Sequence, residues 1–160
     1  MRESIQISNH TAEGFSLFGS WDGAPCENVT VRDCYFGASP NLPAYPTGVG
    51  NHRHVAGTWN KNINIYNNLF DRMPWGGIRP YKFSDLKIHH NHFNNCAYGV
   101  RFSNYDGLGV TGGNPESAKN IEISDNTFVG TLVRDIYIAA WEKGGFIARC
   151  ANTLITFPKD

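Results

Sequence analysis

A nine-residue unit recurs along the chain and limits the folds open to it. Full copies occupy residues 28–36, 62–70, 85–93 and 120–128, and residues 4–10 hold a partial copy. From one copy to the next, the first apolar residue advances by 24, 34, 23 and 35 residues. A basal coil of about 23 residues, with two insertions of about a dozen residues, accounts for all four steps.

Each copy of the unit predicts the same local structure. It opens with alternating apolar and polar residues, which is the pattern of a half-buried strand. Asn or Asp follows in most copies, and Asn tolerates the left-handed backbone angles of a turn. Short strands at a fixed spacing, without a helical pattern, predict an all-β parallel solenoid of about six coils. The alternative is an antiparallel sandwich whose internal similarity is coincidental.

Stacking of these coils, about 4.8 Å apart, predicts two columns of side chains. One column is apolar and faces the interior, and its members are Ile5, Val29, Ile63, Leu86 and Ile121. The other is a ladder of side-chain amides from Asn68, Asn91 and Asn126, which Cys34 interrupts.

Composition excludes several classes of partner. The 160 residues include 14 Lys and Arg and 14 Asp and Glu, and this balance argues against a nucleic-acid partner. No apolar run approaches the roughly 20 residues of a membrane helix, so we expect no membrane insertion. The four cysteines lack zinc-type spacing, and the sequence predicts neither a metal nor a cofactor. We expect one β-helix domain over residues 1–160, either a fragment of a longer chain or a subunit whose ends are covered by copies of itself.

Two irregular segments interrupt the repeat, at about 37–61 and about 103–119. The first is rich in proline and aromatic residues, and the second is rich in glycine. Loops that break the period of a solenoid often carry its function. Both segments leave the coils on the side of the second strand, so we expect them to wall a groove that crosses several coils.

Two arginines form the sharpest single signal. Arg79 and Arg101 each follow the apolar residue of a second strand, so they are expected to face outward, roughly 5 Å apart at Cα. Stacked cations destabilise each other unless an anion lies between them. The anion is either a protein carboxylate, such as Asp106 or Asp71, or an acidic ligand. Guanidinium groups suit carboxylates and phosphates, so an acidic polymer is the ligand that we expect.

His52 and His54 are the candidates for proton transfer. In extended chain their side chains share one face. One imidazole can act as a general base or acid near neutral pH, with Asp106 or Asp22 as its partner. The pair can equally be structural, and chelation of a metal is a third interpretation.

Two other groups of side chains stand out. Aromatic residues close to the irregular segments suit stacking on sugar rings, and the candidates are Trp59, Trp75, Tyr98 and Tyr105. A histidine tract resembles a metal site but lies inside a repeat unit, so we interpret it as solvated surface histidines, at His89, His90 and His92.

The recurring Asn-Ile-x-Ile-x-Asn-Asn-x-Phe unit resembles the right-handed parallel β-helix of the pectate-lyase superfamily, over almost the whole chain. A narrower resemblance lies in residues 25–31 and 46–52, which are similar to tail-spike and appendage proteins of phages that infect Gram-positive bacteria. A Gly-Ile/Val-Gly-Ser-His element is common there, and Asn51 stands in place of its Ser. This resemblance implies a virion protein, often trimeric, that binds and degrades a cell-surface glycan or teichoic acid, with His52 in the catalytic site.

These observations lead to a first hypothesis and two alternatives. The first is a depolymerase of an acidic cell-surface polysaccharide, a lyase or a hydrolase, with His52, Arg79, Arg101 and Asp106 in the catalytic site. Its substrate-binding residues are predicted to be His54, Trp59, Trp75, Tyr98, Tyr105 and Asp22. The alternatives are a glycan-binding adhesin without catalysis and a structural shaft whose arginines pair with a neighbouring subunit.

Overall fold

The computed structural model describes the chain in nine segments, which cover residues 6–8, 13–16, 26–38, 47–50, 59–80, 83–103, 118–139, 148–151 and 154–156. Within these segments all regular elements are β-strands, and each pairs with its neighbours in parallel. None of the described residues belongs to a helix that is long and apolar enough to cross a membrane.

The strands form three sheets, which run along three sides of the molecule. Sheet A contains β1 (Gln6–Ser8), β4 (Tyr35–Gly37), β7 (Leu69–Asp71), β10 (His92–Asn94), β13 (Thr127–Val129) and β16 (Leu154–Thr156). Sheet B contains β2 (Glu13–Ser16), β5 (Thr47–Gly50), β8 (Gly76–Arg79), β11 (Tyr98–Ser103) and β14 (Arg134–Ala139). Sheet C contains β3 (Glu27–Arg32), β6 (Asn60–Tyr66), β9 (Phe83–His89), β12 (Ala118–Ser124) and β15 (Ala148–Ala151).

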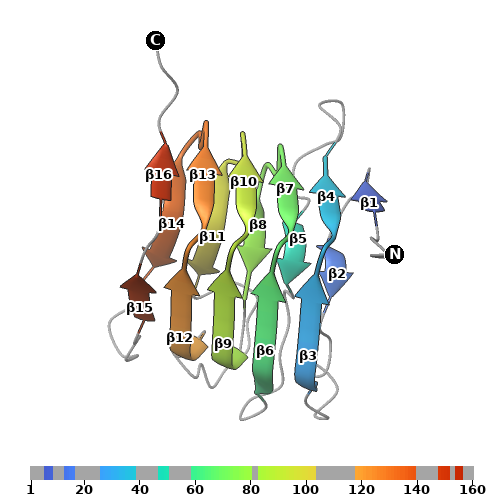
Figure 1. The fold of residues 1–160 in the computed structure, drawn as a ribbon, viewed down its shortest axis with the longest axis vertical. Coiled ribbons are helices and arrows are strands. Elements are labelled where there is room, and N and C mark those ends of the chain that lie inside the picture. The colour runs from blue at the N-terminus through green and yellow to red at the C-terminus, as the bar shows by residue number, and fades with distance from the viewer. Residues whose placement is uncertain are drawn as a thin grey trace, which may run out of the picture.

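Each coil passes through sheet C, then sheet A, then sheet B, before the next coil begins. Figure 1 shows sheets C and A on the near side and sheet B behind them. Sheet A has six strands, so the predicted solenoid of about six coils is confirmed. The β5 strand, which lies within the first irregular segment, pairs with β8.

The predicted interior column is confirmed over four coils. Val29 pairs with Ile63, Ile63 pairs with Leu86, and Leu86 pairs with Ile121. The last three side chains of this column are buried, and Val29 packs against the same core. Ile5, the expected fifth member, lies outside the described residues.

The predicted amide ladder is also confirmed. Asn68 Nδ2 donates to Asn91 Oδ1 over 3.0 Å, and Asn91 Nδ2 donates to Asn126 Oδ1 over the same distance. The Nδ2 of each asparagine also donates to a backbone carbonyl, so these buried amides are fully used. At Cys34 the ladder continues only through the backbone N–H, which donates to Asn68 Oδ1.

A residue with left-handed backbone angles precedes each ladder position, as the turn prediction requires. Its φ is 56° at Asp33, 55° at Asn67, 54° at His90 and 53° at Asp125. Among residues other than glycine, Asp, Asn and His are all enriched in this conformation. His90 therefore fits the same turn as the other members of its column.

A column of glycines faces a stack of phenylalanines across the core. The rings of Phe36, Phe70, Phe93 and Phe128 lie 4.8 to 4.9 Å apart and within 9° of parallel. A Cβ on the glycine of each second strand would lie no more than 2.6 Å from the Phe ring of the next coil, and these glycines are Gly48, Gly77 and Gly99. The close approach of sheets A and B therefore depends on the missing side chains.

Candidate binding site

The outer face of sheet B brings the two predicted arginines together. Ile78 pairs with Val100 inside the coil, so the next residues, Arg79 and Arg101, are neighbours in one outward column. Gly50 precedes them in this column and Tyr137 follows them. The order Gly50, Arg79, Arg101, Tyr137 therefore runs along the outside of sheet B.

The expectation that both arginines face solvent is wrong for Arg79. Its exposed fraction is 6%, and Arg101 is half-buried. A tryptophan in the turn before β8 lies close to both arginines. The Trp75 ring centroid lies 4.0 Å from Arg101 Cζ and 5.9 Å from Arg79 Cζ, so one aromatic ring is shared by the two cations.

Three aromatic rings surround the Arg101 guanidinium. Besides Trp75, the Tyr98 ring lies 4.7 Å from Cζ and the Tyr137 ring lies 5.9 Å from it. The two tyrosine rings are 5.4 Å apart. Each cation–π contact contributes about 0.5–2 kcal/mol, depending on how far it is desolvated. Aromatic faces, not a stacked carboxylate, therefore stabilise the cation among the described residues.

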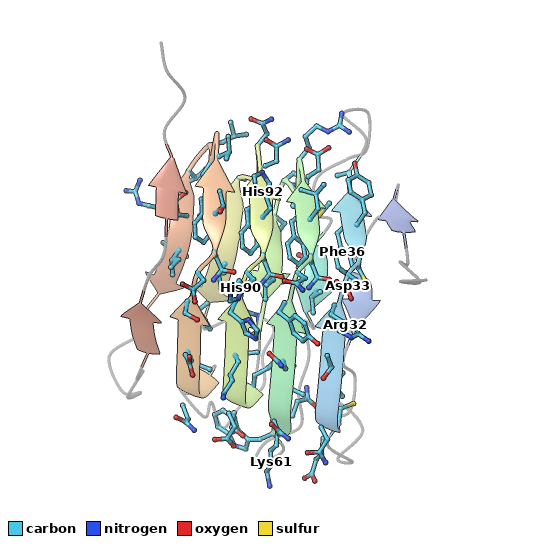
Figure 2. All side chains as sticks on the ribbon, in the orientation of Figure 1. Arg32, Asp33, Phe36, Lys61, His90 and His92 are labelled. Carbon is cyan, nitrogen blue, oxygen red and sulfur yellow. The ribbon has the colours of Figure 1, made fainter. Side chains whose placement is uncertain are left out.

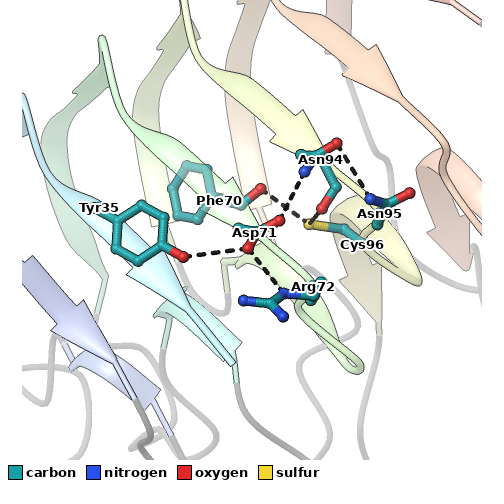
Figure 3. A network of polar contacts seen from close by, with 7 residues as sticks. All are labelled: Tyr35, Phe70, Asp71, Arg72, Asn94, Asn95 and Cys96. Carbon is teal, nitrogen blue, oxygen red and sulfur yellow. Dashed lines mark hydrogen bonds and ion pairs between the residues drawn. The ribbon is translucent and has the colours of Figure 1, made fainter. Parts of the chain in front are cut away.

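Asp71, one of the two carboxylates considered as the counter-ion, is engaged elsewhere. Figure 3 shows it in a network at the edge of sheet A. Its carboxylate accepts hydrogen bonds from Tyr35 Oη at 3.2 Å, Asn94 Nδ2 at 2.7 Å and Arg72 Nε at 2.8 Å. The interpretation of Asp71 as the anion between Arg79 and Arg101 is therefore wrong.

The Arg101 guanidinium carries two unsatisfied donors. Its Nε and Nη1 are buried and have no hydrogen-bond acceptor among the described residues. A buried donor without an acceptor costs about 1–3 kcal/mol, and more when it is charged. We name Trp75, Arg79, Tyr98, Arg101 and Tyr137 the arginine–aromatic cluster.

An apolar corner adjoins this cluster at the start of β14. Leu132 and Val133 are 73% and 46% exposed. Their backbone N–H groups donate to Cys96 O and Ala97 O, so the corner stacks directly on the residues that precede Tyr98. The sequence analysis missed it. The sequence signal for this corner is the pair of consecutive large apolar residues, Leu132 and Val133, in the turn after β13. The matching turn of the preceding coil has the smaller residues Cys96 and Ala97.

The other predicted site residues are divided between buried and undescribed parts of the chain. Trp59 is 8% exposed, so its predicted role in stacking on a sugar ring is wrong because the residue is buried. Five predictions lie outside the described residues, and these are Asp22, His52, His54, Tyr105 and Asp106. Tyr137 was missed, although it occupies the position in its strand that Arg79 and Arg101 occupy in theirs.

Comparison with known proteins places the chain in a family. Residues 2–154 match the family described as the right handed beta helix region. Over 93 residues, or 58% of this chain, it is 41% identical to the plasmin and fibronectin-binding protein A of Streptococcus pneumoniae (strain ATCC BAA-255 / R6). This match covers 13% of that protein.

Two solved structures of PfbA, described as a surface adhesin of Streptococcus pneumoniae, share the fold. Their TM-scores are 0.51 and 0.52, at 21% and 22% sequence identity, and each match covers 94% of this chain. The chain spans 41% and 36% of those two chains. The predicted likeness to phage tail-spike proteins stays a prediction. The stacked parallel sheets and the family match together show that the chain belongs to the right-handed β-helix family.

Proposed function

We propose that this chain is a binding module of a bacterial surface adhesin and that the arginine–aromatic cluster binds an acidic protein partner outside the cell. The similarity to a pneumococcal protein named for binding plasmin and fibronectin supports the general role. The half-buried guanidinium of Arg101 supports the chemistry, since a carboxylate is the acceptor that suits a guanidinium best.

The chemistry of the surface favours a protein over a glycan. Trp, Tyr and Arg are enriched at the energetic centres of protein interfaces. The apolar corner of Leu132 and Val133 adds exposed hydrophobic surface beside the cluster, which a partner with apolar side chains would cover. On β8, β11 and β14, three arginines (Arg79, Arg101 and Arg134) outweigh the single carboxylate of Asp135, so the partner is expected to be acidic.

The observation that carries the proposal is the half-buried Arg101 guanidinium among three aromatic rings, and the test removes that guanidinium. Binding to immobilised fibronectin and to immobilised plasmin is measured by surface plasmon resonance for the wild type, Arg101→Lys and Arg101→Ala. Hydrogen bonds to charged groups contribute about 1.5–3 kcal/mol, so we expect Arg101→Ala to weaken binding at least about tenfold. Arg101→Lys keeps the charge but loses the planar fork, and we expect an intermediate loss.

Arg32→Ala is the matched control. Arg32 is an exposed arginine of sheet C whose guanidinium bonds its own neighbour, Asp33, at 2.7 Å. We expect its affinity to stay within twofold of the wild type. Equal affinities for Arg101→Ala and the wild type, with both variants folded by circular dichroism, would refute the proposed site.

A second experiment distinguishes the proposed protein-binding module from the predicted depolymerase of an acidic glycan. Acidic wall polysaccharide is incubated with the protein, and new chain ends are counted. New ends that disappear in His52→Ala would favour the phage-type enzyme. Glycan binding without new ends, and without binding to either protein, would favour the glycan-binding adhesin. Either result would refute the proposal that the partner is a protein.

A further inference from the structure

Two neighbouring histidines meet at the end of β9, on the outside of sheet C and away from the arginine–aromatic cluster. His89 is the last residue of the strand and His90 is the turn residue after it, where Figure 2 labels it between β9 and β10. Successive side chains of a strand normally point to opposite faces, but the left-handed φ of 54° at His90 changes that direction. The two Nδ1 atoms lie 2.9 Å apart, which is the distance of a hydrogen bond between the two rings.

The ring of His89 is held in one orientation by the preceding coil. It stacks on Tyr66 with the ring centroids 5.0 Å apart and the planes 5° from parallel. Its Nε2 lies 3.0 Å from Asn64 Oδ1, and an amide oxygen only accepts, so Nε2 carries the hydrogen. Both contacts come from β6, and neither is charged at neutral pH. Nδ1 of His89 is therefore the acceptor in the bond between the rings, and Nδ1 of His90 is the donor.

This bond limits the number of protons that the two rings can hold while they stay in contact. The first added proton enters at Nε2 of His90, on the other side of that ring, and makes the existing bond charge-assisted and stronger. The second proton has one position left, which is Nδ1 of His89. Two N–H groups then face each other across the contact, and neither has an acceptor. The pair therefore keeps its hydrogen bond with one added proton and loses it with two.

The surroundings of His89 set the pH range in which the second proton enters. Burial, and then the neighbouring His90, lower the pKa of His89 below its usual 6.5. Lys87 on the same strand acts in the same direction, whereas the carboxylates of Glu122 on β12 and Asp125 in the following turn act against it. The folded chain therefore binds fewer protons here than the unfolded chain. Its stability is expected to fall as the pH decreases from about 6.5 to the lowered pKa of His89.

We propose that His89 and His90 form an acid-sensitive histidine switch, which stays closed with one added proton and opens when the second proton enters. Opening breaks the bond between the rings and turns the His90 side chain away, because β6 holds His89 in place whereas His90 is exposed. The switch lies where the chain passes from sheet C to sheet A, and the backbone N–H of His90 also donates to Ser124 O at 3.3 Å. Acid therefore changes both the charge and the shape of the outside of this turn.

Nuclear magnetic resonance of the full chain, with isotope-labelled imidazole nitrogens, tests the switch. A pH titration follows the protonation of each ring nitrogen and the nuclear Overhauser contact between the two rings. At neutral pH we expect His89 in its Nε2–H tautomer alone. On acidification we expect the contact to survive the first proton and to be lost as Nδ1 of His89 becomes protonated. A mixture of tautomers at His89, or a contact that survives protonation of both rings, would overturn the proposal.

His90→Asn removes the second imidazole and keeps the turn, because Asn67 already takes a φ of 55° at the same position of the preceding coil. An amide is uncharged and can turn its oxygen toward a protonated Nδ1, so we expect the midpoint of the His89 titration to rise. His92→Asn is the matched control, since His92 is an exposed histidine of β10, and we expect the midpoint and the ring contact of the wild type. An unchanged His89 midpoint in His90→Asn, with a native backbone spectrum, would also overturn the proposal.

Discussion

The amide ladder and the arginine column solve the same geometric problem in opposite ways. Both place identical side chains on neighbouring coils, about 4.8 Å apart. An amide is both donor and acceptor, so Asn68, Asn91 and Asn126 satisfy one another. A guanidinium only donates, so Arg79 and Arg101 need a third group, and Trp75 supplies it with a ring face. Stacking therefore stabilises the ladder and leaves two donors of Arg101 unsatisfied.

The largest effect on stability is expected from the middle of the ladder. Asn91 is buried and exchanges hydrogen bonds with both neighbouring asparagines and with Ile65 O. Asn91→Ala leaves several buried groups without partners, at about 1–3 kcal/mol each. We expect the free energy of unfolding to fall by at least about 3 kcal/mol, measured by urea denaturation. A fall in the free energy of unfolding of less than about 1 kcal/mol would show that water takes over the hydrogen bonds of the Asn91 amide.

The glycine column should give the next largest effect. A Cβ at Gly77 would lie 2.6 Å from the ring of Phe93, which is stacked on both sides. Overpacking of this kind costs about 1–3 kcal/mol, so we expect Gly77→Ala to lower the free energy of unfolding by about 2 kcal/mol.

The smaller side chain of Phe93→Leu provides the control for this clash. The double variant Gly77→Ala/Phe93→Leu should be more stable than the sum of the single losses predicts, and a double-mutant cycle measures the difference. Additive losses would contradict direct contact between the column and the stack.

At Cys34, where the amide ladder stops, we expect a substitution that raises the free energy of unfolding by a smaller amount. Cys34 occupies the ladder position, and its backbone N–H already donates to Asn68 Oδ1. Cys34→Asn adds an amide of similar size at this position. We expect the free energy of unfolding to rise by about 1 kcal/mol, the usual net contribution of one hydrogen bond. Cys34→Ser is the control, because its hydroxyl is too short to extend the ladder. Equal stability of the two variants would contradict this account.

The smallest effect on stability is expected from the arginine column. Arg101→Met keeps the length of the side chain and removes the buried donors that have no acceptor. The lost cation–π contacts and the relieved desolvation roughly cancel, so we expect unfolding to change by less than about 1 kcal/mol. Binding should nevertheless fall at least tenfold. A large loss of stability would show that Arg101 is a structural residue and would weaken the case for a binding site.

The predictions from sequence succeeded where the period of the repeat determines position. The interior column, the ladder and the common column of Arg79 and Arg101 follow from spacing alone, because parallel stacking puts equal offsets side by side. The same reasoning failed for Trp59 and for the exposure of Arg79. Both depend on how the side chains of the turns pack over the sheet, and repeat spacing contains no information on that packing.

The amino-acid sequence by itself determined the number of coils, the register between them and the side chains that stack. It could do so because a solenoid uses mostly local contacts, each coil with its two neighbours. Only the tertiary structure decided what those stacked groups do. The direction of Trp75 turned a pair of repelling cations into a cluster, and the left-handed turn at His90 brought two imidazoles face to edge. Both side chains lie in turns between two sheets. The direction of a side chain in such a turn depends on contacts with several strands, which the repeat spacing does not specify.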